Sequence, residues 1–412
     1  MKTSKKIILS AFCLLLSLIA ACATTNTTAP TPKIIMPANI IIPTQPACTS
    51  IESKPTPGPE TPSIFPSVIA TDHVRGSADA AVTILEYVDY QDPRSGELAR
   101  ATKQLFEENP NDVRIVTRPF PIFVVNDKSA YATLDVEAAA EQGKFWELND
   151  LLFAQQANWI NLSVDDFNQW VVTQVSALGM NVEQFKTDRA RKDIVDKVQQ
   201  AWDAGQKIKL PGTPIVVING DLYQGPRDYT SLNDISHLII LGKRQFATCP
   251  PFTIKPSTQY IATLHTEKGD ITLELFGDKT PITVNSFIFL AQHGWYDNIT
   301  FHRVMPKLFA QTGDPSGTGK GNPGYYLVTE ILPTLTFNKP GMVAMVNSGP
   351  NTSGGQFFIT YAPTTQFNGK YTIFGQVLTG MDVLQLLTPR DAQPGANTPP
   401  GDKLTNITIE EK

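Results

Sequence analysis

Residues 260–275 constrain the fold of this chain more than any other stretch. Two runs, 260–265 and 270–275, alternate with a period of two on either side of Lys268-Gly269. Such alternation is typical of a β-hairpin with one buried face. Pro281 then opens a helical pattern, and short strand-like runs separated by glycines follow it as far as residue 376. Short strands at this spacing predict a closed β-barrel with flanking helices.

Within this region, residues 301–314 combine one cation with apolar side chains and a carboxamide. The stretch reads Phe-His-Arg-Val-Met-Pro-Lys-Leu-Phe-Ala-Gln-Thr-Gly-Asp, with Arg303 near its start and Gln311 eight positions later. An arginine does not lose its proton, so it is neither an acid nor a base here. It donates oriented hydrogen bonds, which apolar neighbours strengthen by lowering the local dielectric. These residues suit a site that holds a peptide and polarises one amide bond.

Length and composition predict two folded domains after a leader, because 412 residues exceed one ordinary domain. The net charge of −5 and the lack of a basic stripe argue against nucleic acid as a partner. The five histidines are scattered and no Cys-x-x-Cys occurs, so we expect no metal site.

The first 22 residues predict an exported protein. Lys2, Lys5 and Lys6 precede an apolar run, 7–19, that is too short to span a bilayer comfortably. The run ends in Ile-Ala-Ala-Cys at Cys22, which resembles the bacterial lipoprotein signal. The resemblance implies lipidation of Cys22 and a membrane anchor on the extracytoplasmic face. Ordinary cleavage near the same small residues, which leaves a soluble secreted protein, is the alternative.

A spacer rich in threonine and proline covers residues 23–69, and repeated prolines favour an extended chain there. Cys13 leaves with the leader and Cys22 is expected to carry lipid, so Cys48 and Cys249 remain. Two cysteines of an exported protein can form one disulfide, which would tie the spacer to the junction after the first domain. Two free thiols are the alternative.

Residues 70–248 read as a first, α/β domain. The β-branched run 82–89 and the run 113–118 predict strands on either side of a helix over 95–108. A mostly helical stretch follows to residue 205. Pro214 then leads into a strand that ends in an Asn-Gly turn, and a last helix covers 232–241.

This order of elements resembles the thioredoxin-fold family of the DsbA type. Residues 87–91 are similar to the lead-in to that family's redox motif, and Pro214 is the candidate for its cis-proline. Where the family has Cys-Pro-x-Cys, residues 92–95 are Asp-Pro-Arg-Ser. Disulfide exchange needs an attacking thiolate, so this site has no thiol redox activity. Two roles remain open: non-covalent binding of extended polypeptide beside Pro214, or a spacer with a decayed site.

The second domain, residues 258–412, resembles the bacterial cyclophilins, which are peptidyl-prolyl cis-trans isomerases. The resemblance rests on seven blocks that occur in order: 266–271, 280–287, 301–304, 311–314, 317–319, 351–359 and 368–375. It implies that Arg303 is the catalytic cation. It also implies a set of substrate-binding residues, namely Gln311, Asn347 and Gln356 for the peptide backbone, Phe309, Phe358 and Phe367 around the proline ring, and also Leu308 and Tyr371. His302 is expected to be structural.

Three positions depart from patterns within that family. Leu308 stands where phenylalanine is usual, which predicts a looser pocket and lower efficiency. Gln366 stands where cyclosporin-sensitive members have tryptophan, which predicts weak cyclosporin binding. Tyr371 replaces the histidine of eukaryotic members and is common among bacterial ones.

The chemistry of prolyl isomerisation fits these residues. The peptide bond resists rotation with a barrier of about 18–20 kcal/mol, and an X-Pro bond left alone interconverts in roughly tens to hundreds of seconds. A donor aimed at the prolyl nitrogen weakens the amide resonance in the twisted state, so catalysis is preferential binding of that state. No nucleophile, metal or cofactor is required.

The sequence therefore predicts an exported, lipid-anchored isomerase that assists the folding of unfolded or partly folded exported polypeptides containing X-Pro bonds. The first rival is a peptide-binding chaperone lipoprotein with little isomerase turnover, and the second is a structural surface lipoprotein.

Overall fold

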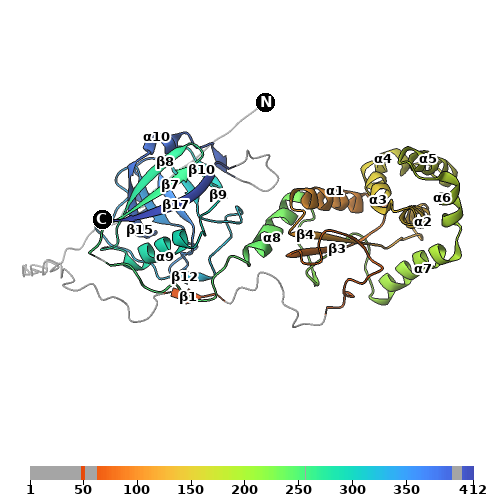
Figure 1. Ribbon diagram of the computed structural model, residues 1–412, viewed down its shortest axis with the longest axis horizontal. Helices are drawn as coiled ribbons and strands as arrows, with labels where there is room; N and C mark the ends of the chain where they lie inside the picture. Colours follow the sequence, from red (N-terminus) through yellow and green to blue (C-terminus); the bar gives the residue numbers. More distant parts are fainter. Residues whose placement is uncertain (1–47, 52–62, 256, 392–400) are drawn as a thin grey trace, which may run out of the picture. The chain divides into compact units, whose positions relative to one another are not determined.

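The computed structural model describes residues 48–51, 63–255, 257–391 and 401–412 (Figure 1). The predicted leader, the lipidation site at Cys22 and most of the spacer lie outside these residues. None of the helices in the described part of the chain is long and apolar enough to cross a membrane.

The first domain is built on a five-stranded sheet. Its strand order is β2 (His73–Arg75), β4 (Val113–Pro119), β3 (Val82–Val88), β5 (Ile215–Ile218) and β6 (Asp221–Leu222). Only β3 and β4 are parallel. The central strand β3 is an almost unbroken β-branched and apolar run because it is buried on both faces. Helices α1 (Pro93–Glu108) and α8 (Tyr229–Leu241) pack against each other beside the sheet.

Six helices form an insertion between β4 and β5 (Figure 1). They are α2 (Ser129–Ala140), α3 (Phe145–Ala154), α4 (Gln156–Trp159), α5 (Val164–Ala177), α6 (Val182–Arg189) and α7 (Lys192–Lys207). Trp159, Phe153 and Phe167 are fully buried and join the insertion to the core under the sheet. Trp146 and Trp170 are partly buried against the same cluster. The insertion is thus part of one hydrophobic core rather than a separate body.

The second domain contains a ten-stranded antiparallel sheet. Its order is β16 (Arg390–Asp391), β10 (Arg303–Met305), β11 (Phe309–Thr312), β14 (Phe357–Thr360), β13 (Met342–Met345), β15 (Ile373–Thr379), β8 (Gly269–Leu275), β7 (Tyr260–Thr266), β17 (Lys403–Glu411) and β9 (Ile299–Thr300). Helices α9 (Pro281–Gln292) and α10 (Met381–Gln385) flank the sheet (Figure 1). A 3-10 helix, η1 (Thr365–Phe367), precedes β15.

The prediction of a closed barrel is wrong, because the sheet is a curled half-barrel. Its order ends at β16 on one side and β9 on the other, and among the described residues no strand pairing joins these ends. Strands β9 and β10 follow each other in the chain, but each pairs elsewhere. Phe301 and His302 cross the gap between them as a two-residue bend, so the connection there is covalent and not a ladder of hydrogen bonds.

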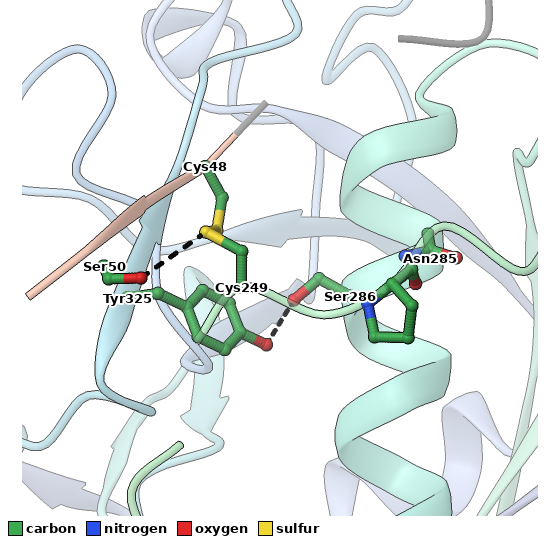
Figure 2. The surroundings of a disulfide bond; sticks show 7 residues. Cys48, Ser50, Cys249, Asn285, Ser286 and Tyr325 are labelled. Atoms are coloured by element: carbon green, nitrogen blue, oxygen red, sulfur yellow. Dashed lines mark hydrogen bonds between the residues drawn. A yellow bond between two sulfur atoms is a disulfide. The ribbon is translucent and has the colours of Figure 1, made fainter. Parts of the chain in front are cut away.

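A disulfide attaches a distant segment to this second domain. Cys48 and Cys249, which are 201 positions apart, are bonded, and this is the pairing that sequence favours. Strand β1 (Cys48–Ser50) pairs antiparallel with β12 (Tyr325–Leu327). Figure 2 shows the bond next to Tyr325, whose hydroxyl group lies 2.8 Å from that of Ser286 in α9. The disulfide therefore holds an added strand against the domain.

Candidate active site

A β-hairpin carries the predicted catalytic residue. Strands β10 and β11 pair in register from Arg303 opposite Gln311 to Met305 opposite Phe309. The turn between them needs a left-handed residue, which is Lys307 at φ 67°. The amide of Leu308 donates to the carbonyl of Met305 at 3.0 Å and closes this turn. The short loop fixes the register, so the eight-residue spacing of Arg303 and Gln311 becomes a direct cross-strand pair.

The same register continues into the next strand and places three predicted site residues in one row. Gln311 lies opposite Phe358 of β14 as well as opposite Arg303 of β10. Residues directly opposite each other in a sheet share a face, and so do residues two apart on one strand. Arg303, Gln311, Phe358 and Phe309 therefore project from the same face of the sheet.

An aromatic cluster lies beside this row. Phe309 and Phe358 are buried, and Leu308, Phe367 and Tyr371 are partly buried against them. The ring centroids of Phe358 and Phe367 are 5.7 Å apart, and those of Phe358 and Tyr371 are 5.2 Å apart, both in edge-on geometry. Such packing favours fixed ring positions. The three residues predicted to surround the proline ring thus share one apolar cluster with Leu308 and Tyr371.

A chain of amides runs from the row into the neighbouring loop. The Gln311 side-chain amide donates to the Gln356 side-chain oxygen at 3.0 Å. Gln356 in turn donates to the backbone carbonyls of Gly319 and Gly321, at 3.1 and 2.9 Å. Both glutamine side chains are buried, so these bonds fix their orientation.

Asn347 is not part of the row and lies in the loop after β13. Its side-chain amide donates to the carbonyl of Lys370 at 2.9 Å. It lines a cavity of about 290 Å³ together with Gln356 and Tyr326. The structure therefore places Asn347 in a side cavity that is connected to the row through Gln356, the hydrogen-bond partner of Gln311.

Arg303 lies at the edge of the site, with its side chain 41% exposed. Its guanidinium carbon is 5.3 Å from the centroid of the Phe309 ring. Its Nε donates to a carboxylate oxygen of Asp391 at 2.8 Å. The cation thus lies where the apolar cluster meets solvent.

His302, the neighbour of Arg303, is buried between the bend and the loop at Gly319. Burial lowers the pKa of His302, although the Asp314 carboxylate opposes the shift. The imidazole is therefore neutral at physiological pH and brings no charge to the site.

Sequence reasoning missed several members of this site. Phe337 is fully buried in the aromatic cluster and its ring centroid is 5.9 Å from that of Phe358, but it lies in a loop with no periodic pattern. Met305 and Met342 also belong to the cluster. The only available signal for Met305 was its position two residues after Arg303, on the same strand face.

A polar network occupies residues 92–95, where the sequence resembles the redox motif of the thioredoxin-fold family. Asp92 caps α1, and its carboxylate accepts from the hydroxyl groups of Ser95 and Thr213, each at 3.0 Å. Arg94 donates to the carbonyl of Thr213 at 3.0 Å, and the Thr213-Pro214 bond is cis. The side chains of Asp92 and Ser95 thus hydrogen-bond to each other.

Comparison with known proteins decides the family of the second domain. A family model described as "Cyclophilin type peptidyl-prolyl cis-trans isomerase/CLD" matches residues 261–409. The peptidyl-prolyl cis-trans isomerase CYP18-1 of Arabidopsis thaliana is 44% identical over 150 residues, which are 36% of this chain and 94% of that protein. The chain belongs to the cyclophilin-type peptidyl-prolyl cis-trans isomerases.

Two further relatives of the cyclophilin domain come from other lineages. Peptidyl-prolyl cis-trans isomerase-like 1 of Aspergillus fumigatus is 49% identical over 123 residues, which are 29% of this chain and 76% of that protein. The probable peptidyl-prolyl cis-trans isomerase A of Mycobacterium bovis is 44% identical over 147 residues, covering 32% of this chain and 81% of that protein. The predicted isomerase activity, of EC type 5.2.1.8, is confirmed at the level of the family.

The upstream domain has a match of its own. A family model described as "Thioredoxin" matches residues 69–235. The predicted thioredoxin-like fold ahead of a cyclophilin domain is therefore confirmed.

Proposed function

We propose that this chain is an exported folding factor whose cyclophilin domain isomerises X-Pro bonds in exported polypeptides. The observation that carries the proposal is the row of Arg303, Gln311 and Phe358, held in register beside an aromatic cluster.

Each part of the site has a task in this reaction. The apolar cluster around Phe358 holds the proline ring, and the buried amides of Gln311 and Gln356 fix the flanking backbone. Arg303 supplies donors to the prolyl nitrogen when the bond is twisted. These donors are worth more in the twisted state than in either planar state, so they lower the barrier instead of only tightening binding.

The test is Arg303→Ala, assayed as catalysed isomerisation of an X-Pro peptide. The loss of one preorganised donor costs about 10²–10³ in rate, and we expect a fall of that size in kcat/KM. Lys403→Ala serves as the control, because it removes a positive charge from an exposed position on strand β17 of the same domain. An Arg303→Ala enzyme as fast as wild type would reject the proposed role.

Anchoring at Cys22 is the second part of the proposal, and it is supported by the apolar run that ends in Ile-Ala-Ala-Cys. In bacterial cells that express the full chain, a labelled fatty acid should become attached to wild type and not to Cys22→Ala. Unlabelled wild type found in the medium would favour the soluble secreted form.

The thioredoxin-like domain has a candidate function of its own, the non-covalent binding of extended client polypeptide. A cavity of about 660 Å³ lies between α1, Pro214, the loop 225–228 and the first residue of α8, and Leu98 and Ala101 give it apolar walls. No thiol chemistry is available there, because positions 92–95 hold Asp-Pro-Arg-Ser.

The binding role is tested by suppression of client aggregation. Gln104→Trp fills the cavity from the exposed side of α1, while Gln169→Trp adds the same ring to exposed α5 as a control. We expect Gln104→Trp alone to lower the suppression, and we expect the effect to persist in Arg303→Ala. Equal suppression by both tryptophan variants would favour a simple spacer.

A further inference from the structure

Strand β16 brings a carboxylate to the catalytic arginine. Asp391 lies directly opposite Arg303 in the antiparallel pairing of β16 with β10, and its carboxylate accepts from Arg303 Nε at 2.8 Å. The neighbouring Arg390 donates from Nε to the carbonyl of His302 at 3.2 Å. The short strand is thus fixed to the active-site hairpin by its backbone and by both of its side chains.

The bond to Nε leaves the rest of the guanidinium for substrate. A guanidinium is a planar fork with five N–H donors, and Nε carries one of them. Asp391 holds Nε–H, and the guanidinium carbon lies 5.3 Å from the Phe309 ring centroid. These two contacts restrict the orientation of the guanidinium plane. The two terminal nitrogens then keep one direction relative to the aromatic cluster.

The pair is too exposed to matter for stability. The side chain of Arg303 is 41% exposed and that of Asp391 is 38% exposed. Ion pairs in such positions add little to the free energy of folding, because water screens the charges and two long side chains lose freedom. We therefore expect Asp391 to affect the orientation of Arg303 and to leave the melting temperature of the domain almost unchanged.

The geometry points to Asp391 as a positioning residue for prolyl isomerisation, one that orients the Arg303 guanidinium towards the twisted peptide bond. It touches neither the proline ring nor the reacting nitrogen and acts only through Arg303. This role rests on the proposed role of Arg303 as the catalytic donor.

The magnitude follows from the freedom that Arg303 would regain. Ordering one long side chain during binding lowers the corresponding equilibrium or rate constant by a factor of about 3 to 10. We therefore expect Asp391→Ala to lower kcat by about 3- to 10-fold with little change in KM, because the missing order is needed mainly in the transition state. Asp391→Asn keeps an acceptor oxygen for Nε–H, so it should recover most of this loss.

The test is a double-mutant cycle on the full chain, with kcat and KM measured for an X-Pro peptide. The variants are wild type, Asp391→Ala, Arg303→Ala and the double variant, together with Asp391→Asn. Asp278→Asn, an exposed carboxylate on the turn before α9, controls for charge. If Asp391 acts through Arg303, removing it in the Arg303→Ala background should change nothing.

A spectroscopic signal separates positioning from a general structural effect. The Nε–H resonance of Arg303 should shift and exchange faster with water in Asp391→Ala, with the backbone amides of β11 and the melting temperature unchanged. Wild-type or higher kcat in Asp391→Ala overturns the inference, and so does an equal fall in Asp278→Asn or an additive double variant. If Asp391→Ala does not fold, Asp391→Leu, which also lacks a side-chain acceptor for Nε–H, takes its place in the cycle and in the resonance measurement. Arg303→Ala at wild-type speed would instead reject the proposed function itself.

Discussion

The disulfide between Cys48 and Cys249 allows a quantitative test of how the chain is held together. The perturbation is the double substitution Cys48→Ser and Cys249→Ser, with reduction of the wild-type chain as a second route to the same state. Cys249 and Cys48 both pack against the core of the second domain, and β1 pairs with β12 of that domain. Removing the bond should therefore destabilise the cyclophilin domain and leave the thioredoxin-like domain unaffected.

The magnitude depends on how much chain the bond constrains when the second domain unfolds. If the full separation of 201 positions counts, the chain-entropy model gives about 5 kcal/mol. The thioredoxin-like domain has its own core and can stay folded, so only roughly 30 residues outside β2 to α8 count as loop. The same model then gives about 3.5 kcal/mol, which corresponds to a fall of about 7–14 °C in the melting temperature of a domain of this size.

Two measurements on the full chain distinguish the domains. Loss of isomerase activity with temperature reports the cyclophilin domain, and calorimetry reports both transitions. The activity midpoint should fall in the double variant and in reduced wild type, while the other transition stays in place. An activity midpoint that moves by less than about 3 °C would refute the reasoning, since roughly 1 kcal/mol is then all that the bond contributes.

Three further predictions follow from the structure. Burial raises the pKa of Asp135 to about 7 despite its ion pair with Arg189, so the folded chain holds a proton that the unfolded chain has lost above pH 4. The stability that this proton adds is complete below about pH 4 and disappears as the pH rises through 7. The melting temperature should therefore fall as the pH rises from 5 to 8, and Asp135→Asn should make this fall smaller. An equally large fall in Asp135→Asn would contradict the prediction. Glu330 accepts from the amides of Ile282 and Thr283 at the start of α9, so Glu330→Ala should cost about 1 kcal/mol in urea unfolding, whereas exposed Glu267→Ala should cost almost nothing. Gln366 is exposed on η1, and Gln366→Trp should tighten cyclosporin binding in a calorimetric titration; equal affinity would show that another position limits it.

The elements with strong local signals could be predicted from sequence. The hairpin of β7 and β8 follows from its period of two, and α9 begins at the Thr280-Pro281 step because proline suits the first helical turn. The start of α1 shifts by two residues, from the predicted Ser95 to Pro93, because Asp92 caps it.

Other elements depend on pairing that no local pattern records. Strand β16 has only two residues and β12 only three, so their existence rests on neighbours that are distant in sequence. The start of α9 is another case, because the carboxylate that accepts from the amide of Ile282 belongs to Glu330, which lies 48 positions further along the chain. The open edge of the sheet was missed for the same reason, because short strands indicate a curled sheet but not whether its two ends meet.

The pairing of β17 with β7 has a consequence for how the protein matures. These are the last and first strands of the cyclophilin domain, and the backbones of Gln259 and Lys412 exchange hydrogen bonds of 3.3 and 2.9 Å. During synthesis the sheet cannot be completed until its final strand has emerged. The elements from β2 to α8 precede it by about 170 residues, which is a delay of roughly 10–30 s at ordinary translation rates. For that interval the thioredoxin-like domain can be folded while the isomerase is still an incomplete sheet with an exposed edge, and so could itself become a client of other folding factors.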